Sequence, residues 1–257
     1  MIIGTKETVR ATTSEDLRGY MDRWYKGSNM LVVVAGKIVQ GTKYNVQSLI
    51  EEKFGMMAES PLEKYETAAS YGKPEHRHFK KKTEQAHFYM GVPGLSITDP
   101  RRWALQMGQI VLGGGMSSRL FNEIREKRGL AYYVKADLDM NFDCGSLGVR
   151  AGVKLEQLSE AMKVVKEEML KLADTITESE LIKAKEYVLG HMPLSLEGSM
   201  DIAQFYGVRA LVRDDIRHPD QIVKNVSAVD LASVKKVLNE IVTEEMLRSV
   251  VVGPKAK

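Results

Sequence analysis

Two side chains that could act together in chemistry lie in one stretch of the sequence, residues 113–134. Arg125 and Tyr132 stand seven positions apart, with Gly129 between them as a predicted helix stop. Both groups donate hydrogen bonds, so they could bind the carbonyl of an extended substrate or stabilise a developing oxyanion. The structural alternative is that Arg125 stabilises a helix C-terminus while Tyr132 buries its ring, and composition alone favours this alternative.

A segment of small residues precedes this pair. It contains Gly113, Gly114, Gly115, Ser117 and Ser118. Glycine tolerates positive φ and close backbone contact, and either serine could cap the helix that follows. Exposed N–H groups at a helix start can bind phosphate. Gly108 and Gly113 have the spacing of a P-loop, but Gly114 stands where the motif requires Lys, and no dinucleotide fingerprint is present. A hinge or close packing therefore explains the glycines about as well as a ligand does.

Five histidines raise the question of a metal site. Neither H-E-x-x-H nor H-x-x-E-H occurs in the sequence, so no zinc hydrolase centre can be assembled from a recognised motif. His76 and His78 flank Arg77 in a polar segment, and we interpret them as solvated surface residues. The sequence predicts no metal ligand in this chain.

The composition is ordinary for a globular protein of 257 residues. There are 37 Lys and Arg against 34 Asp and Glu, and this net charge of +3 gives no global field for nucleic acid or an anionic membrane. The short basic clusters at 80–82 and 101–102 lack interleaved aromatic residues. The lone Cys144 excludes an intramolecular disulfide, and neither a signal sequence nor a membrane-length apolar run is visible. We expect a cytoplasmic protein.

The elements around Arg125 and Tyr132 are a helix and a β-hairpin. An apolar stripe at helical spacing predicts a short helix that ends at Gly129. Residues 130–140 and 146–153 predict two strands that pair through a short turn. Arg125 and Tyr132 thus flank one tight corner between helix and strand, where they could point into the same space.

The other elements surround this hairpin. Predicted strands lie at 29–36, 85–92 and 247–252, and predicted helices at 12–27, 46–54, 100–111, 155–169, 178 onward, 200–212, 219–226 and 228–241. Capping-box patterns occur at Thr12 with Glu15 and at Thr177 with Glu180, and Asp99 can cap the helix after it. The polar segment 56–82 is interpreted as an interdomain connector.

An internal repeat suggests the domain organisation. The helix-to-strand module of residues 16–36 has a counterpart at 230–253. If both modules close a copy of one unit, the first copy lacks everything before its closing module, about 150 residues. We therefore predict an α+β fold with a mainly antiparallel sheet packed against helices. Residues 1–57 would be the tail of a truncated first domain, 58–83 a linker, and 84–257 a complete second domain.

Two segments carry a resemblance to a known family, LGGGMSSRLFNEIREKRGLAYYV and TSEDLRGYMDRWYKGSNMLVVVAG. They closely resemble the pitrilysin/insulinase family of zinc metallopeptidases, the inverzincins, in particular short members related to processing proteases and mitochondrial processing peptidase. The similarity runs over residues 3–254. It implies subunits of two similar α+β domains, and two such subunits or halves that close around an extended peptide.

The resemblance also implies roles for individual residues. Arg125 and Tyr132 occupy the family's R-x-x-x-x-x-x-Y positions, which reach toward the zinc centre of the other half and hold the scissile carbonyl and its oxyanion. Residues 113–118 are similar to a glycine-rich segment near the substrate path. The family's H-x-x-E-H zinc motif is absent from this sequence, so zinc is expected on a missing half or partner.

We therefore expect the substrate-binding, non-metal half of a metalloendopeptidase, which is inactive alone and needs an H-x-x-E-H-bearing half or subunit. The expected substrate is an extended peptide, and neither a nucleic acid nor a membrane is expected as a partner. A homo-oligomer, such as a dimer, is possible. The alternatives are a non-catalytic scaffold subunit of the same fold and a phosphate-binding module at the glycines. Arg125 and Tyr132 favour the first interpretation, and the glycine loop lacks the basic partner that a phosphate site needs.

Overall fold

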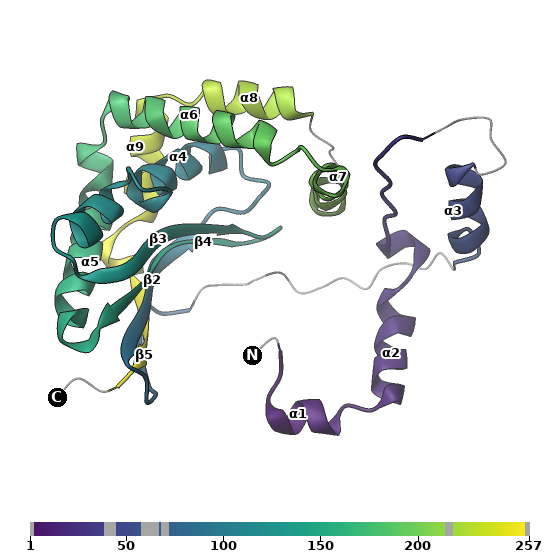
Figure 1. Ribbon diagram of the computed structural model, residues 1–257, viewed down its shortest axis with the longest axis horizontal. Coiled ribbons are helices and arrows are strands. Elements are labelled where there is room, and N and C mark those ends of the chain that lie inside the picture. The colour runs from purple at the N-terminus through teal and green to yellow at the C-terminus, as the bar shows by residue number, and fades with distance from the viewer. Residues whose placement is uncertain (1–2, 39–44, 58–66, 68–71, 214–217, 255–257) are drawn as a thin grey trace. The chain divides into compact units, whose positions relative to one another are not determined.

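The computed structural model describes residues 3–38, 45–57, 67, 72–213 and 218–254. These residues form two compact units (Figure 1). The small unit lies within residues 1–66 and 196–216, and the large unit within residues 67–195 and 217–257. The large unit contains every residue that the sequence singles out for chemistry.

A five-stranded sheet forms the centre of the large unit, with the strand order β1-β5-β2-β4-β3. Its strands are β1 (His76–Lys80), β2 (Gln85–Gly94), β3 (Ala131–Met140), β4 (Gly145–Lys154) and β5 (Arg248–Gly253). Neighbouring strands are antiparallel except β1 and β5, which run parallel. The predicted α+β fold with a mainly antiparallel sheet is thereby confirmed.

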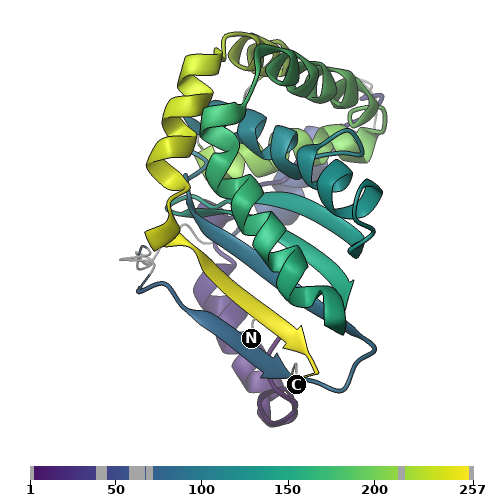
Figure 2. The ribbon, with the colours of Figure 1, turned by 90° about the vertical axis from the view of Figure 1, so that its left-hand side faces the viewer.

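The helices of the large unit lie on one side of this sheet (Figures 1 and 2). They are α4 (Arg102–Gly113), η2 (Phe121–Glu126), α5 (Leu158–Thr175), α6 (Glu178–Leu194), α8 (Pro219–Ser227) and α9 (Leu231–Ile241), with single turns at η3 (Leu155–Gln157) and η4 (Glu244–Met246). Helices α4, α5 and α9 pack directly against the strands. Within the described part of the chain, no helix combines the length and apolarity needed to cross a membrane.

The alternation of side chains along the central strands decides which face the helices cover. Phe88 and Met90 of β2 and Val149 and Ala151 of β4 alternate with more polar neighbours, and all four are buried. Leu105 of α4 is fully buried as well. Because burial of a large apolar side chain contributes about 1.5–3 kcal/mol, this layer fixes the face on which β3 and β4 meet α4.

The segment expected to be a connector contains a strand. β1 lies within it and pairs in register with β5, His76 opposite Ser249 and Lys80 opposite Gly253. The sequence HRHFK has no strand pattern of its own. It forms a strand because the edge of β5 supplies partners for its backbone hydrogen bonds. His76 and His78 therefore lie in a strand within the expected connector, and both are exposed, as their interpretation as solvated surface residues predicts. The division into residues 1–57, 58–83 and 84–257 stays a prediction about the family's domains.

Several helix starts differ from the predicted ones. Helix α2 (Ser14–Trp24) is capped by Thr13 with Asp16, one residue after the predicted pair. Helix α4 begins at Arg102, after Asp99 and Pro100, and α9 begins at Leu231. The capping box of Thr177 with Glu180 is confirmed at the start of α6. Helix termini depend on local side-chain bonds, so neighbouring candidate caps are hard to separate from sequence alone.

The small unit consists of helices with little buried surface. It contains α1 (Lys6–Ala11), which the sequence did not predict, α2, the turn η1 (Gly27–Asn29), α3 (Val46–Phe54) and α7 (Ser199–Arg213). The predicted strand at 29–36 is wrong, since these residues join no strand of the described chain. A strand needs a partner for its backbone groups, and the apolar run MLVVVA remains partly exposed, Val33 at 37%.

A substitution at Gly113 tests how closely the C-terminus of α4 packs against β3. A Cβ at this position would lie 2.5 Å from the backbone nitrogen of Ala136 in β3. We expect Gly113→Ala to lower the free energy of unfolding by about 1–3 kcal/mol, because the overpacked backbone must shift. Gly115→Ala is the matched control, since its Cβ would meet only Tyr187 at 3.5 Å. Equal urea midpoints for the two variants would contradict this packing.

Candidate functional site

The corner that carries Arg125 and Tyr132 is built by one left-handed glycine. Gly129 has a φ of 60°, which is the left-handed conformation that commonly follows the end of a helix. Glycine adopts it without the steric penalty of a Cβ atom. Its N–H donates to the carbonyl of Arg125 at 3.2 Å, and the N–H of Leu130 donates to that of Ile124 at 2.8 Å. The chain then enters β3 at Ala131. The predicted helix stop at Gly129 and the strand after it are confirmed.

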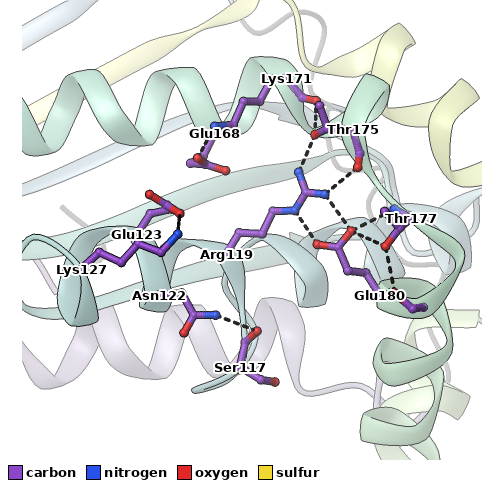
Figure 3. Close-up of polar contacts among 11 residues, drawn as sticks. Ser117, Arg119, Asn122, Glu123, Lys127, Glu168, Lys171, Thr175, Thr177 and Glu180 are labelled. Atoms are coloured by element: carbon purple, nitrogen blue, oxygen red, sulfur yellow. Dashed lines mark hydrogen bonds and ion pairs between the residues drawn. The ribbon is translucent and has the colours of Figure 1, made fainter.

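The helix before this corner is wider than the predicted α-helix. Residues Phe121–Glu126 form a π-helix, in which the N–H of Lys127 donates to the carbonyl of Asn122 at 2.9 Å. The carbonyl of Ser118 accepts from the N–H of Asn122, and that of Ser117 from its side chain (Figure 3). π-helical turns are rare and occur often at functional sites. The sequence pattern missed this turn because its apolar stripe is also compatible with an α-helix.

Arg125 is the cation of this helix that the described carboxylates leave available. Lys127 and Arg128 both pair with Glu123, and Arg119 pairs with a residue of α6. Arg125 is exposed, forms no ion pair with any described carboxylate, and stacks its guanidinium over the ring of Phe121 at 4.9 Å. Stacking on an aromatic ring holds the guanidinium in place while its N–H groups remain able to donate.

Tyr132 is the extra residue of a β-bulge. Ala131 pairs with Val153 and Tyr133 pairs with Gly152, so Tyr132 has no partner in β4. By alternation its side chain would share the inward face with Val134, yet it is 54% exposed. Bulges redirect side chains next to active sites. A tyrosine at an inward position of the alternation is the sequence signal for this bulge, whereas the pattern as a whole predicted a regular strand.

Arg119 fixes the start of the π-helix (Figure 3). Its guanidinium makes two parallel hydrogen bonds to Glu180 of α6, each of 2.7 Å. It also donates to the hydroxyl and the carbonyl of Thr175 at the end of α5, at 2.6 and 2.9 Å. A bidentate Arg–carboxylate pair is strong and directional. Residues of α5 and α6 thus hold the segment that leads to Arg125, whereas the sequence pattern predicted only a capping role for Glu180.

The same contacts set the charge of two carboxyls. Burial alone would raise the pKa of Glu180, but hydrogen bonds from Arg119 and Thr177 outweigh it and lower that pKa to about 2. Hydrogen bonds from Lys127 and Arg128 lower the pKa of Glu123 to about 2. Both carboxylates therefore stay ionised down to low pH, and both networks persist with them.

The glycine segment lies against β3 rather than in a strained loop. None of Gly113, Gly114 and Gly115 has positive φ, so conformational freedom does not explain them. Close approach explains two of them, because a Cβ would meet Ala136 at 2.5 Å from Gly113 and Ile110 at 2.7 Å from Gly114. The segment also borders a cavity of about 370 Å³. Its walls are Gly113, Gly114, Gly115, Met116, Phe121, Tyr133, Val134, Lys135 and Arg150.

The described residues do not offer a ligand set for zinc. Among them, no three His, Cys, Asp or Glu side chains cluster in a way that could hold a metal ion. The histidines are bound singly instead: His76 contacts the hydroxyl of Ser249 at 2.8 Å, and His87 contacts that of Tyr133 at 3.2 Å. Any zinc chemistry of a larger assembly would need ligands beyond those described here.

Known proteins similar to this chain are named as zinc proteases. The sequence profile of the peptidase M16 inactive domain matches residues 11–188. An uncharacterized zinc protease of Streptomyces coelicolor is 32% identical over 98% of this chain and 56% of its own length. The uncharacterized zinc protease YmxG of Bacillus subtilis is 32% identical over 95% of this chain and 59% of its own length. The chain thus spans somewhat more than half the length of these curated relatives.

The fold is also similar to that of a solved structure. The crystal structure of a peptidase M16 inactive domain from Pseudomonas fluorescens matches 98% of this chain and 60% of that chain, with a TM-score of 0.84. The sequences are 18% identical, so the likeness is one of fold.

The Arg119–Glu180 pair predicts a specific acid sensitivity. Because the pKa of Glu180 falls from 4.5 to about 2 on folding, its stabilisation is complete above pH 4.5 and is lost as the pH falls toward 2. We expect the free energy of unfolding of Glu180→Gln to be lower at pH 7 and to fall less steeply between pH 4.5 and 2. Urea titrations across this range measure both effects.

Glu178→Gln is the control, because it removes an exposed carboxyl from the same first turn of α6. Glu123 contributes in the same pH window, so the comparison is repeated in a Glu123→Gln background. If the free energy of unfolding of Glu180→Gln and of the wild-type chain varied in parallel with pH, the Arg119–Glu180 ion pair would not stabilise the fold.

Proposed function

This chain belongs to the peptidase M16 family, through a match to its inactive domain, and from that premise we propose that it is the substrate-binding, non-metal half of a zinc metalloendopeptidase. The family match confirms the resemblance first seen around Arg125 and Tyr132. The observation that carries the proposal is the position of these two side chains on either side of one corner, where both are exposed and Arg125 forms no ion pair with a described carboxylate.

The proposed chemistry of this half is hydrogen-bond donation. The guanidinium of Arg125 and the hydroxyl of Tyr132 would donate to the carbonyl oxygen of the scissile peptide bond. As that oxygen gains negative charge in a tetrahedral intermediate, both bonds strengthen. A positioned donor of this kind contributes about 10²–10³-fold to the rate. The bound metal would supply the activated water, from ligands that this half does not provide.

The proposed partner is an H-x-x-E-H-bearing half, on the same polypeptide or on a separate subunit. The zinc proteases similar to this chain are longer than it, since the match covers 56% and 59% of their lengths. The small unit supports such a partner as well. Its apolar side chains Leu17, Tyr20 and Leu49 are all more than half exposed. An exposed apolar surface of this kind fits the closing part of a first α+β domain, the role we propose for residues 1–57.

The proposed substrate is an extended peptide, and the proposed location is the cytoplasm. One cysteine in 257 residues fits a reducing compartment. A homo-oligomer, such as a dimer whose two copies close around the peptide, remains open. The second candidate function, a non-catalytic scaffold subunit, is compatible with the description of the matching domain as inactive.

Reconstitution tests the proposal. The chain alone should show no zinc-dependent cleavage of extended peptides, and mixing it with an H-x-x-E-H-bearing half should produce cleavage that a chelator abolishes. The physical reason is that neither half holds both the metal ligands and the two donors. Zinc-dependent cleavage by the purified chain alone, with contaminating proteases excluded, would contradict this assignment.

Two substitutions test the donors in the reconstituted assembly. Arg125→Ala and Tyr132→Phe should each lower kcat by about 10²–10³-fold, because each removes one donor to the oxyanion. Lys127→Ala is the matched control, since it removes a cation from the same helix that already pairs with Glu123. Unchanged turnover in both test variants would leave the scaffold function.

A further inference from the structure

We propose that the cavity beside the glycine segment is a subsite for a carboxylate of the bound peptide, an inference that rests on the proposed function and gives it a substrate preference. The cavity is about 370 Å³ in volume, within the usual range for a binding pocket. The side chains along its walls include the two cations Lys135 and Arg150 and no carboxylate. An anionic group is therefore the occupant that this lining favours.

The two cations stand directly opposite each other in the sheet. Lys135 of β3 pairs in register with Arg150 of β4, so their side chains lie on the same face. Like charges in directly opposite positions destabilise a sheet. A sequence selected only for stability would avoid this pair of like charges. In natural proteins such unfavourable local arrangements occur mainly at functional sites.

One carboxylate offsets the pair only in part. Asp137 accepts from Nε of Arg150 at 2.8 Å, and its other oxygen lies 3.9 Å from Nζ of Lys135. Both cations are about half exposed, so each has donors that face solvent. One negative charge against two positive charges leaves a net positive wall. A second carboxylate, supplied by a ligand, would complete the balance.

The cavity is lined by a residue that contacts Arg125 and by the residue that follows Tyr132. Phe121 forms one wall and carries the guanidinium of Arg125 on its ring at 4.9 Å. Tyr133 forms another wall and is the residue after Tyr132. A peptide whose scissile carbonyl lies at Arg125 and Tyr132 would thus have a neighbouring residue within reach of this cavity.

The wall at Tyr133 is held in place by the sheet. Its ring lies across Gly152 of β4, where a Cβ would come within 2.6 Å of the ring, and its hydroxyl contacts His87 of β2 at 3.2 Å. The ring therefore spans from β3 over β4 to β2, the central strand. A wall fixed in this way needs little ordering when a ligand binds, which favours affinity.

The test measures binding of fluorescent peptides to the full chain by anisotropy. The peptides differ at one position only, with Glu, Gln or Lys, and each is made with a free or an amidated C-terminus. We expect the Glu peptide, or the peptide with the free C-terminus, to bind about tenfold more tightly than its neutral counterpart, the size of one charge-assisted hydrogen bond at a half-exposed site. The two series distinguish a side-chain carboxylate from a terminal one.

Variants locate the effect. Lys135→Gln with Arg150→Gln should abolish the preference for the carboxylate while the neutral peptide binds as before. Lys154→Gln is the matched control, because it removes an exposed cation from the same strand outside the cavity. A thermal melt of each variant shows that it is folded.

The outcomes separate this inference from the proposed function. Equal binding of charged and neutral peptides, or a preference that survives in the double variant, overturns the carboxylate subsite and leaves the peptide-binding half intact. Binding of no peptide overturns both. A tenfold preference that is lost only in the double variant supports the subsite.

Discussion

The bidentate ion pair between Arg119 and Glu180 is the interaction on which the candidate site depends. It joins the start of the π-helix to the first turn of α6, and the bonds from Arg119 to Thr175 add the end of α5 (Figure 3). A π-helical turn is intrinsically less favourable than an α-helical one, so it persists where surrounding contacts determine it. Arg125 owes its position to this clamp on one side and to the turn at Gly129 on the other.

The site is open on the side where chemistry would occur. The charged residues Arg119, Lys127 and Arg128 around the π-helix are paired with carboxylates. In contrast, Arg125 stacks on the ring of Phe121, Tyr132 has no partner in β4, and Lys135 stands opposite Arg150. The bulge at Tyr132 and the like-charge pair are local departures from what stability alone would select. Together they suit the proposed surface, which a peptide and a metal-bearing half would complete.

The sequence predicted the parts of this arrangement that depend on local chemistry. The stop at Gly129, the hairpin of β3 and β4 and the capping box at Thr177 follow from turn, strand and cap residues. The roles of Arg125 and Tyr132 stay a prediction from the family motif. The π-helix, the bulge at Tyr132 and the Arg119 clamp depend on contacts between distant segments. Strand β1 and the missing strand at 29–36 show the same limit, since a strand exists only where a partner edge is present.

A crystal structure of the chain assembled with its metal-bearing half and an uncleaved extended peptide tests the central claim most directly. The measured quantities are the distances from the guanidinium of Arg125 and the hydroxyl of Tyr132 to the scissile carbonyl oxygen. We predict that both lie within hydrogen-bonding distance of this one oxygen, about 3.2 Å or less. A bound peptide whose scissile carbonyl is contacted only by the other half, with both side chains turned away, would contradict the account.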